Sequence, residues 1–245
     1  MSPLAHIPYC GAAPVPGAVA WNLDPLLVAI LVAGAGAHLW AMRRDPPSRV
    51  AAVAAGWALL AALFISPLCN LSVALFSARV AQHMLLTLAA APLIALGLPA
   101  VARRGPLTPA CAFAAVLWFW HLPRPYDAAF ASDAVYWAMD LSLLAAALGL
   151  WAALLRPGVR PAAVLAAALL TSLQMSLLGA LLSFAPQPLF QVHLATTAPW
   201  GLTPLHDQQL GGALMWVPGG FLFAAVLAAV LYRVMLPRPP VLDPP

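Results

Sequence analysis

The sequence predicts an all-α, polytopic membrane protein that folds as a bundle of seven transmembrane helices. Of its 245 residues, 64% are hydrophobic and only 7% are charged, whereas a soluble domain has about 25% charged residues. A soluble protein of this length has too little interior to bury so much apolar surface. The composition therefore excludes a soluble enzyme and predicts an integral membrane protein.

Seven apolar runs, each near the length that crosses a bilayer, follow one another along the chain. They cover residues 24–42, 50–65, 74–98, 107–122, 134–155, 162–184 and 212–235. The fourth run is short, and we expect it to tilt little or to end in the interface. The runs leave no room for a second domain. The expected organisation is an extracytoplasmic tail over 1–23, a seven-helix domain over 24–236 and a cytoplasmic Pro-rich tail over 237–245.

The charged residues indicate which way the helices run. All 11 basic residues are Arg, and nine of them lie at connections and ends on one side of the predicted bundle. Only Arg79 and Arg124 lie on the opposite side. Because cytoplasmic loops carry the excess of positive charge, we expect the N-terminus outside and the C-terminus in the cytoplasm. The N-terminal tail lacks Lys and Arg, so no cleaved signal is expected. The cations are dispersed, so no nucleic-acid binding is expected.

Imidazole and thioether groups collect toward the predicted outer side. His83 lies about 13 Å into the third run at 1.5 Å per residue, and His121 closes the fourth run. Two more imidazoles, His193 and His206, lie in the longest outer loop, residues 185–211, where Asp207 adds a carboxylate. Four thioethers lie in the outer halves of their runs, Met84, Met139, Met175 and Met215, and all of them except Met139 are candidate ligands. Imidazole and thioether ligands suit copper, especially Cu(I), so their shared depth predicts a copper site.

Polar side chains inside the runs support a functional interior. Arg79, Gln82 and His83 are spaced so that they share one helix face. Ionisable groups in a span are costly and usually face the bundle interior in pairs, so we expect Arg79 to pair with Asp140 or Asp133 beside His83. The candidates to orient the imidazole ligands are Gln82, Asp127 and Gln174.

Each candidate also has a purely structural interpretation. The aromatic residues before His121 are typical of an interfacial belt, and His83 can be a hydrogen-bonded core residue. The loop imidazoles can be solvated, and methionines often fill gaps in a core. Cys10 and Cys69 both lie on the predicted outer side. We favour a disulfide between them over a thiolate pair that passes a metal inward.

Three motifs resemble the integral-membrane cytochrome c oxidase assembly factor CtaG family. The first is Leu75-Phe76-Ser77-Ala78 with Gln82-His83-Met84-Leu85-Leu86 and Ala91-Pro92-Leu93. The second is Trp118-Phe119-Trp120-His121-Leu122-Pro123 with Tyr126-Asp127-Ala128-Ala129. The third is Asp207-Gln208-Gln209-Leu210-Gly211-Gly212 with Met215-Trp216-Val217-Pro218-Gly219-Gly220.

The resemblance implies a multi-pass protein of the bacterial inner (plasma) membrane that helps to make active haem–copper oxidase, by supporting copper insertion. Carried over residue by residue, it implies roles for His83, His121, Asp207 and Met215. Many members have a second His four residues before the His83 position, where this chain has Arg79. A fixed positive charge there weakens cation binding nearby unless Asp140 offsets it.

The expected function is therefore an assembly factor for a haem–copper cytochrome c oxidase that binds copper at the outer membrane face. Its expected partners are oxidase subunits, the lipid bilayer and a copper donor protein. Two alternatives stay open: a metal-free membrane scaffold for oxidase subunits, and a copper or small-solute transporter. The almost wholly apolar inner half of the runs disfavours a transporter. No nucleophile–base pair or cofactor fingerprint stands out, so we expect no enzymatic activity.

Overall fold

The computed structural model describes residues 6–99 and 105–235, and within them all regular secondary structure is helical. The α-helices are α1 (Pro25–Ala41), α2 (Pro47–Ile65), α3 (Pro67–Ala74), α4 (Phe76–Leu85), α5 (Ala91–Ala95), α6 (Leu107–Trp120), α7 (Pro123–Ala131), α8 (Asp133–Leu154), α9 (Pro161–Ser183) and α10 (Pro204–Met235). A π-helical turn, η1 (Leu86–Ala90), joins α4 to α5, and two 3₁₀ turns, η2 (Gln191–His193) and η3 (Ala198–Trp200), lie between α9 and α10.

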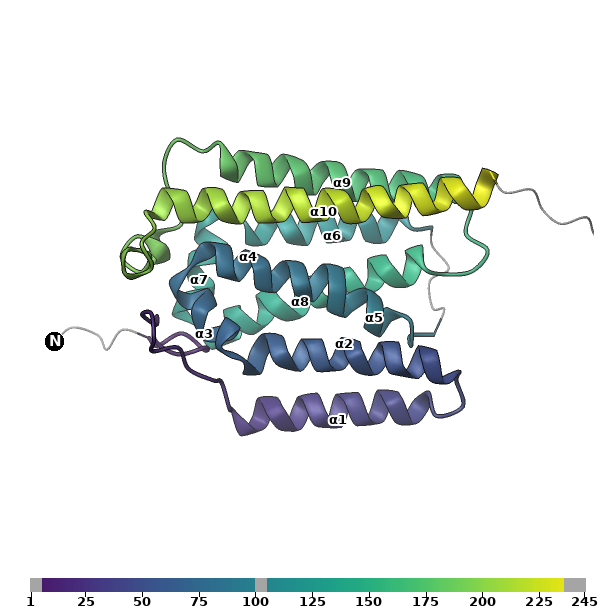
Figure 1. Cartoon of the computed structure of the whole chain (residues 1–245), viewed down its shortest axis with the longest axis horizontal. Coiled ribbons are helices and arrows are strands. Elements are labelled where there is room, and N and C mark those ends of the chain that lie inside the picture. The colour runs from purple at the N-terminus through teal and green to yellow at the C-terminus, as the bar shows by residue number, and fades with distance from the viewer. Residues whose placement is uncertain (1–5, 100–104, 236–245) are drawn as a thin grey trace, which may run out of the picture.

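The long helices lie side by side in one bundle (Figure 1). The pair α1 and α2 forms one edge, and the pair α9 and α10 forms the other, with α4, α6 and α8 between them. Residues 6–24, α3, α7 and the connection from α9 to α10 gather at one end. The charge distribution predicts that this end faces outward, so we call it the predicted outer end.

Five helical segments are long and apolar enough to cross a membrane: Pro47–Ile65, Phe76–Ala95, Asp133–Leu154, Pro161–Ser183 and Pro204–Tyr232. Two shorter apolar helices, α1 and α6, occupy the first and fourth predicted runs. The 14 residues of α6 cover about 21 Å at 1.5 Å per residue, less than the ~30 Å of a hydrocarbon core. The chain is thus an all-α multi-pass protein, while the count of seven spans and their orientation stay predictions.

The third predicted run is not one helix starting at Ala74. Helix α3 ends there, Leu75 is extended with φ −124° and ψ 130°, and α4 begins at Phe76. Further along, the N–H of Ala91 donates to the carbonyl of Leu86, which makes a wider turn just before Pro92. Proline has no N–H, and its ring crowds the carbonyl four residues earlier. A π turn is one way for a helix to absorb that clash.

The seventh run also begins earlier than predicted. Helix α10 starts at Pro204, not at Gly212, because proline is preorganised for the first turn of a helix. Its N-terminal turn includes His206 and Asp207, so these two residues lie on a helix and not in the predicted loop. His193 is likewise not in irregular loop structure, since it ends the short turn η2.

The N-terminal segment is fastened to the predicted outer end. Cys10 and Cys69 are joined by a disulfide, with their Cα atoms 5.4 Å apart. The amide of Asn70 donates to the carbonyls of Cys10 and Ala12, each at 2.9 Å, and its oxygen accepts from the N–H of Ala20. These bonds hold residues 6–24 against the start of α3.

Candidate functional site

A buried charged cluster joins α4 to α8. Nη1 of Arg79 lies 3.9 Å from Oδ2 of Asp140, and Nε2 of His83 lies 3.2 Å from Oδ1. All three side chains are buried. The Arg79 guanidinium also lies 5.1 Å from the ring centroids of Phe130 and Tyr136, a distance typical of cation–π contacts. Between the two expected carboxylate partners, the structure places Asp140 beside Arg79, while Asp133 contacts His6 at 3.1 Å.

Hydrogen bonding in this cluster is incomplete among the described residues. Both carboxylate oxygens of Asp140, Nε2 of His83 and two nitrogens of Arg79 have no hydrogen-bond partner there, so these groups meet only in the ion-pair contacts at 3.9 Å and 3.2 Å. A buried polar group left without a partner costs about 1–3 kcal/mol. The cluster therefore has unused capacity for a further polar partner.

The other two buried imidazoles, His193 and His121, differ in how many of their ring nitrogens form hydrogen bonds. Nδ1 of His193 lies 3.3 Å from the carbonyl of Ala74 and Nε2 lies 2.8 Å from the hydroxyl of Tyr126. A carbonyl only accepts, so Nδ1 donates and Nε2 accepts from the tyrosine, which uses both nitrogens. Nδ1 of His121 donates to the carbonyl of Leu117 at 2.7 Å. This bond fixes the tautomer in which Nε2 of His121 carries a free lone pair.

Asp207 of α10 is hydrogen-bonded to the start of α4. Its carboxylate is fully buried and accepts from the backbone N–H of Phe76 at 2.6 Å and of Ser77 at 3.2 Å, and from the Ser77 hydroxyl. The first N–H groups of α4 have no partner within their own helix, and Asp207 of α10 supplies one, as a capping side chain does at a helix N-terminus. Its lone pairs are engaged in this cap.

The predicted orienting residues contact groups other than imidazoles. The amide of Gln82 donates to the carbonyl of Leu63 at 2.8 Å, and the oxygen of Gln174 accepts from the indole of Trp118 at 3.0 Å. The carboxylate of Asp127 accepts from the backbone of Gln191 at 3.3 Å. In each case the side chain ties two segments of the bundle together.

Not all of the predicted imidazoles are free to bind a shared metal ion. His206 is exposed, and His193 is bonded within the protein. Among residues 6–99 and 105–235, no three His, Cys, Asp or Glu side chains converge so that they could hold a metal ion. His83 and Asp140 supply two ligands, but the charge of Arg79 already balances that of Asp140. A cation added there would carry an uncompensated charge at a buried place, which is unfavourable.

Two of the thioether side chains, by contrast, approach the same place beside α10. A methyl group placed on Gly219 would lie 3.2 Å from Cε of Met175 and 3.4 Å from Cε of Met84. The terminal methyl groups of a methionine from α9 and one from α4 therefore both lie next to this glycine. Met215 lies one turn before Gly219 on α10 and is buried. Sequence reasoning named all three but ranked the imidazoles first, since helical rotation was unknown.

Two tyrosines and a serine were not singled out by the sequence. Tyr126 donates to His193, the Tyr136 hydroxyl lies 3.4 Å from Sγ of Cys10, and Ser77 completes the Asp207 cap. Tyr126 and Ser77 lie within the three sequence motifs described above, and this position was the one indication that they matter. Tyr136 had no signal of its own, because its role depends on the disulfide and on Arg79.

Comparison with known proteins gives one match. A family model described as cytochrome c oxidase caa3 assembly factor (Caa3_CtaG) matches residues 32–106 and 102–236. These two stretches include every buried residue of the charged cluster and all three thioethers. No curated protein and no solved structure matches the chain.

Proposed function

The chain belongs to the cytochrome c oxidase caa3 assembly factor family, and from this premise we propose that it holds Cu(I) for the oxidase between α4, α9 and α10. Copper in this role is cargo that is received and passed on. The proposed ligands are the thioethers of Met84, Met175 and Met215. Thioethers are soft ligands that select Cu(I) over harder ions.

One observation carries the proposal: the terminal methyl groups of two methionines from different helices both lie next to Gly219. A glycine at that position leaves the space that a side chain would fill. Methionine is flexible and polarisable, so small rotations of its three side-chain bonds bring sulfur atoms onto one ion. The neighbouring charged cluster, by contrast, offers a carboxylate, which suits harder ions than Cu(I).

The position suits a transfer role. Helix α4 begins at the predicted outer end, and Met84 lies eight residues from Phe76, about 12 Å along the axis. His121 offers a free imidazole nitrogen at the predicted outer end of α6, a suitable exit ligand for exchange with an oxidase subunit. A copper donor protein would deliver the ion from the same side.

The proposal is tested by Cu(I) binding to the purified full chain in detergent, in competition with a coloured Cu(I) chelator. We expect the wild type to retain Cu(I) and Met84→Leu/Met175→Leu to lose at least about tenfold in affinity, because leucine keeps the volume but removes the soft donor. Met139→Leu is the matched control, since Met139 is fully buried in α8. A wild type that takes up no Cu(I), or a double variant that binds normally, contradicts the proposal.

A second candidate is a metal-free scaffold for oxidase subunits. It is favoured because His193 and Asp207 form hydrogen bonds that hold the bundle together, so neither side chain is free to bind a metal ion. The two candidates separate in cells that express Met84→Leu/Met175→Leu. A copper-handling factor leaves the oxidase without its copper, whereas a scaffold of this kind keeps the oxidase fully metallated and still co-purifies with its subunits.

A further inference from the structure

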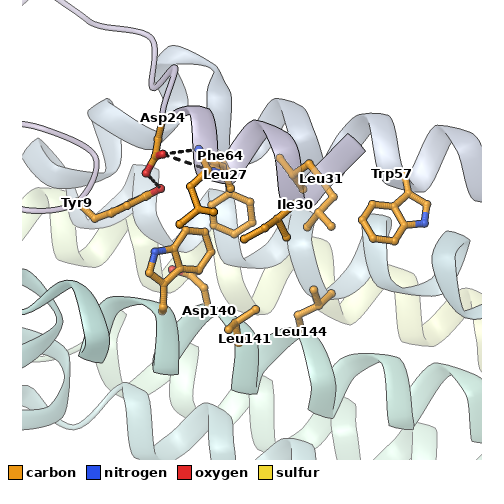
Figure 2. A pocket seen from close by; sticks show the side chains of 13 residues that line it. Tyr9, Asp24, Leu27, Ile30, Leu31, Trp57, Phe64, Asp140, Leu141 and Leu144 are labelled. Carbon is orange, nitrogen blue, oxygen red and sulfur yellow. Dashed lines mark hydrogen bonds between the residues drawn. The ribbon is translucent and has the colours of Figure 1, made fainter. Parts of the chain in front are cut away.

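Helix α1 lies at the edge of the bundle, and its two sides differ in the size of their side chains. On the side turned toward α8, Leu27 and Leu31 are buried (Figure 2). On the other side, positions three or four residues apart share a face and have exposed, small side chains: Ala29, Ala33, Gly36 and Ala37. A methyl group on Gly36 would meet nothing within 4 Å. We call this side the small face of α1, and no described part of the chain covers it.

The small face ends at an exposed tryptophan and an arginine that packs on it. Trp40 lies in the last turn of α1 and is 67% exposed. The guanidinium carbon of Arg43 lies 4.1 Å from the centroid of the Trp40 ring, and Nη1 donates to the Trp40 carbonyl at 3.0 Å. These contacts hold the guanidinium in place and leave most of its five N–H donors free. Tryptophan with a neighbouring cation is typical of the level of the lipid headgroups.

The positive charge at this end of α1 is not balanced by acids. Asp45 is the one carboxylate in the connection from α1 to α2, and it pairs with Arg49 at 2.9 Å. Arg49 also donates through Nε to the carbonyl of Leu96 at 2.7 Å. Arg43 and Arg44 are exposed, and neither has an ion-pair partner in the described part of the chain. Two positive charges are thus free to bind an anion from outside the chain.

An anionic phospholipid matches the charges and the small face together. The planar guanidinium groups suit the oxygens of a phosphate. From Trp40 to Ala29 the small face extends about 16 Å at 1.5 Å per residue, about half of a ~30 Å hydrocarbon core, which is the depth that an acyl chain covers in one leaflet. A soluble anion would use the arginines without the small face, and a partner helix would use the small face without the arginines.

We propose that α1 binds one anionic phospholipid, with its phosphate on Arg43 and Arg44 and one acyl chain along Ala37, Gly36 and Ala33. The headgroup lies at the end of the bundle that the charge distribution predicts to face the cytoplasm, where basic residues attract anionic lipid. The site is separate from α4, α9 and α10. It is therefore independent of the proposed copper site, and the failure of either proposal leaves the other standing.

The test is photolabelling of the full chain in phosphatidylcholine nanodiscs. Two probes have the same diazirine-bearing acyl chain, one on phosphatidylglycerol and one on phosphatidylcholine, so they differ only in the headgroup. Labelled peptides are mapped by mass spectrometry. We expect the phosphatidylglycerol probe to label α1 about tenfold more than the phosphatidylcholine probe does, because two arginines attract the net negative charge. Both probes should label the lipid-facing side of α9 equally, at Leu173, which is 60% exposed.

A pair of double variants separates this site from a general effect of charge. Arg43→Gln/Arg44→Gln removes both proposed phosphate ligands, and the preference for phosphatidylglycerol at α1 should fall to that measured on α9. Arg156→Gln/Arg160→Gln is the matched control, because it removes the same charge from the connection between α8 and α9 at the same end of the bundle (Figure 1). It should leave the preference intact. An unchanged preference in the first variant, or an equal loss in the control, overturns the proposal.

A third variant examines the path of the acyl chain. Gly36→Leu places a side chain where nothing in the described chain meets it, so the packing of α1 is kept while the small face is obstructed. We expect labelling of α1 by the phosphatidylglycerol probe to fall several-fold. Gly220→Leu on α10 also projects into open space and should leave the labelling of α1 unchanged. Normal labelling of Gly36→Leu would mean that no acyl chain lies on the small face, and the proposal is then wrong.

Competition in the wild type distinguishes the other occupants of the same surface. Glycerol 3-phosphate has the anionic head without the chains, and we expect it not to displace the phosphatidylglycerol probe. Displacement by this soluble anion would assign a phosphate site that needs no lipid. If neither probe labels α1 while both label α9, a protein covers the small face. Either result contradicts the proposal.

Discussion

His193 is a titratable group whose charge state is set by its surroundings. It lies outside the membrane-spanning helices, buried between Tyr126 and the carbonyl of Ala74. Loss of solvent lowers its pKa from 6.5 to about 3, and the positive charge of Arg79 adds to the effect. The folded protein therefore holds His193 neutral at a pH where the unfolded chain already protonates it.

This difference makes stability depend on pH in a defined direction. Between pH 6.5 and about pH 3 the unfolded state binds a proton that the folded state does not, so the free energy of unfolding falls as the pH falls. From about pH 7.5 to about pH 5, the contribution of His193 amounts to about 2 kcal/mol. The variant His193→Gln keeps a polar side chain but cannot titrate. On the same change of pH, we expect its free energy of unfolding to fall by about that much less than that of the wild type.

The measurement is thermal unfolding in detergent at the two pH values. His206→Gln serves as the control, since His206 is exposed, and it should follow the wild type. If His193→Gln loses as much stability on acidification as the wild type does, His193 is not held neutral by the fold.

The α9–α10 pair shows what holds two helices together when the hydrophobic effect is weak. Inside a membrane, close packing through small residues takes its place. A methyl group on Gly212 would lie 2.6 Å from the carbonyl oxygen of Gly179, and one on Gly179 would lie 2.8 Å from the carbonyl oxygen of Gly212. The two backbones approach as closely as they do because neither position has a side chain.

Gly212→Ala is expected to push α9 and α10 apart and to lower the free energy of unfolding by about 1–3 kcal/mol, as overpacking does elsewhere. Gly220→Ala is the matched control on the same helix, because a methyl group there meets nothing within 4 Å. Its expected effect is neutral or slightly stabilising, since alanine favours a helix over glycine. Denaturation of both variants in the same detergent compares them. If the two variants are equally stable, the contact between Gly179 and Gly212 does not limit how closely α9 and α10 approach each other.

At the scale of the whole molecule, opposite ends of the bundle carry different chemistry. His206, in the first turn of α10, and the disulfide at the start of α3 lie at the predicted outer end. Ser48 lies next to Arg49 in the first turn of α2, and α2 begins at the opposite end of the bundle (Figure 1). The positive-inside rule predicts that the second end faces the cytoplasm.

The orientation is tested with single cysteines in a Cys111→Ser background, which removes the free cysteine of the described residues. A membrane-impermeant maleimide should label His206→Cys in right-side-out vesicles. It should label Ser48→Cys only after the membrane is permeabilised. Both positions are exposed, so accessibility within the fold does not limit either reaction. The reverse pattern would show that the bundle is inserted the other way round.

The class of the protein and the approximate positions of its apolar helices follow from the amino-acid composition of each run. Crossing lipid requires that backbone groups be satisfied within each helix, so this information is local and is written in the composition of each run. The placement of Arg79 beside Asp140 was also within reach, because a span offers a charge very few partners. The motifs around His83, His121 and Asp207 were sufficient to indicate the family.

Which side chains meet depends on how the helices pack, and this is not readable from the sequence of any one run. The break at Leu75, the π turn before Pro92 and the early start of α10 each change the direction of side chains in ways that residue counting does not capture. Rotation and tilt of a helix are set by its packing against neighbours. For that reason His193 is bonded within the protein, although its place in the sequence suggested a loop ligand, while Met84 and Met175 approach the same glycine from different helices.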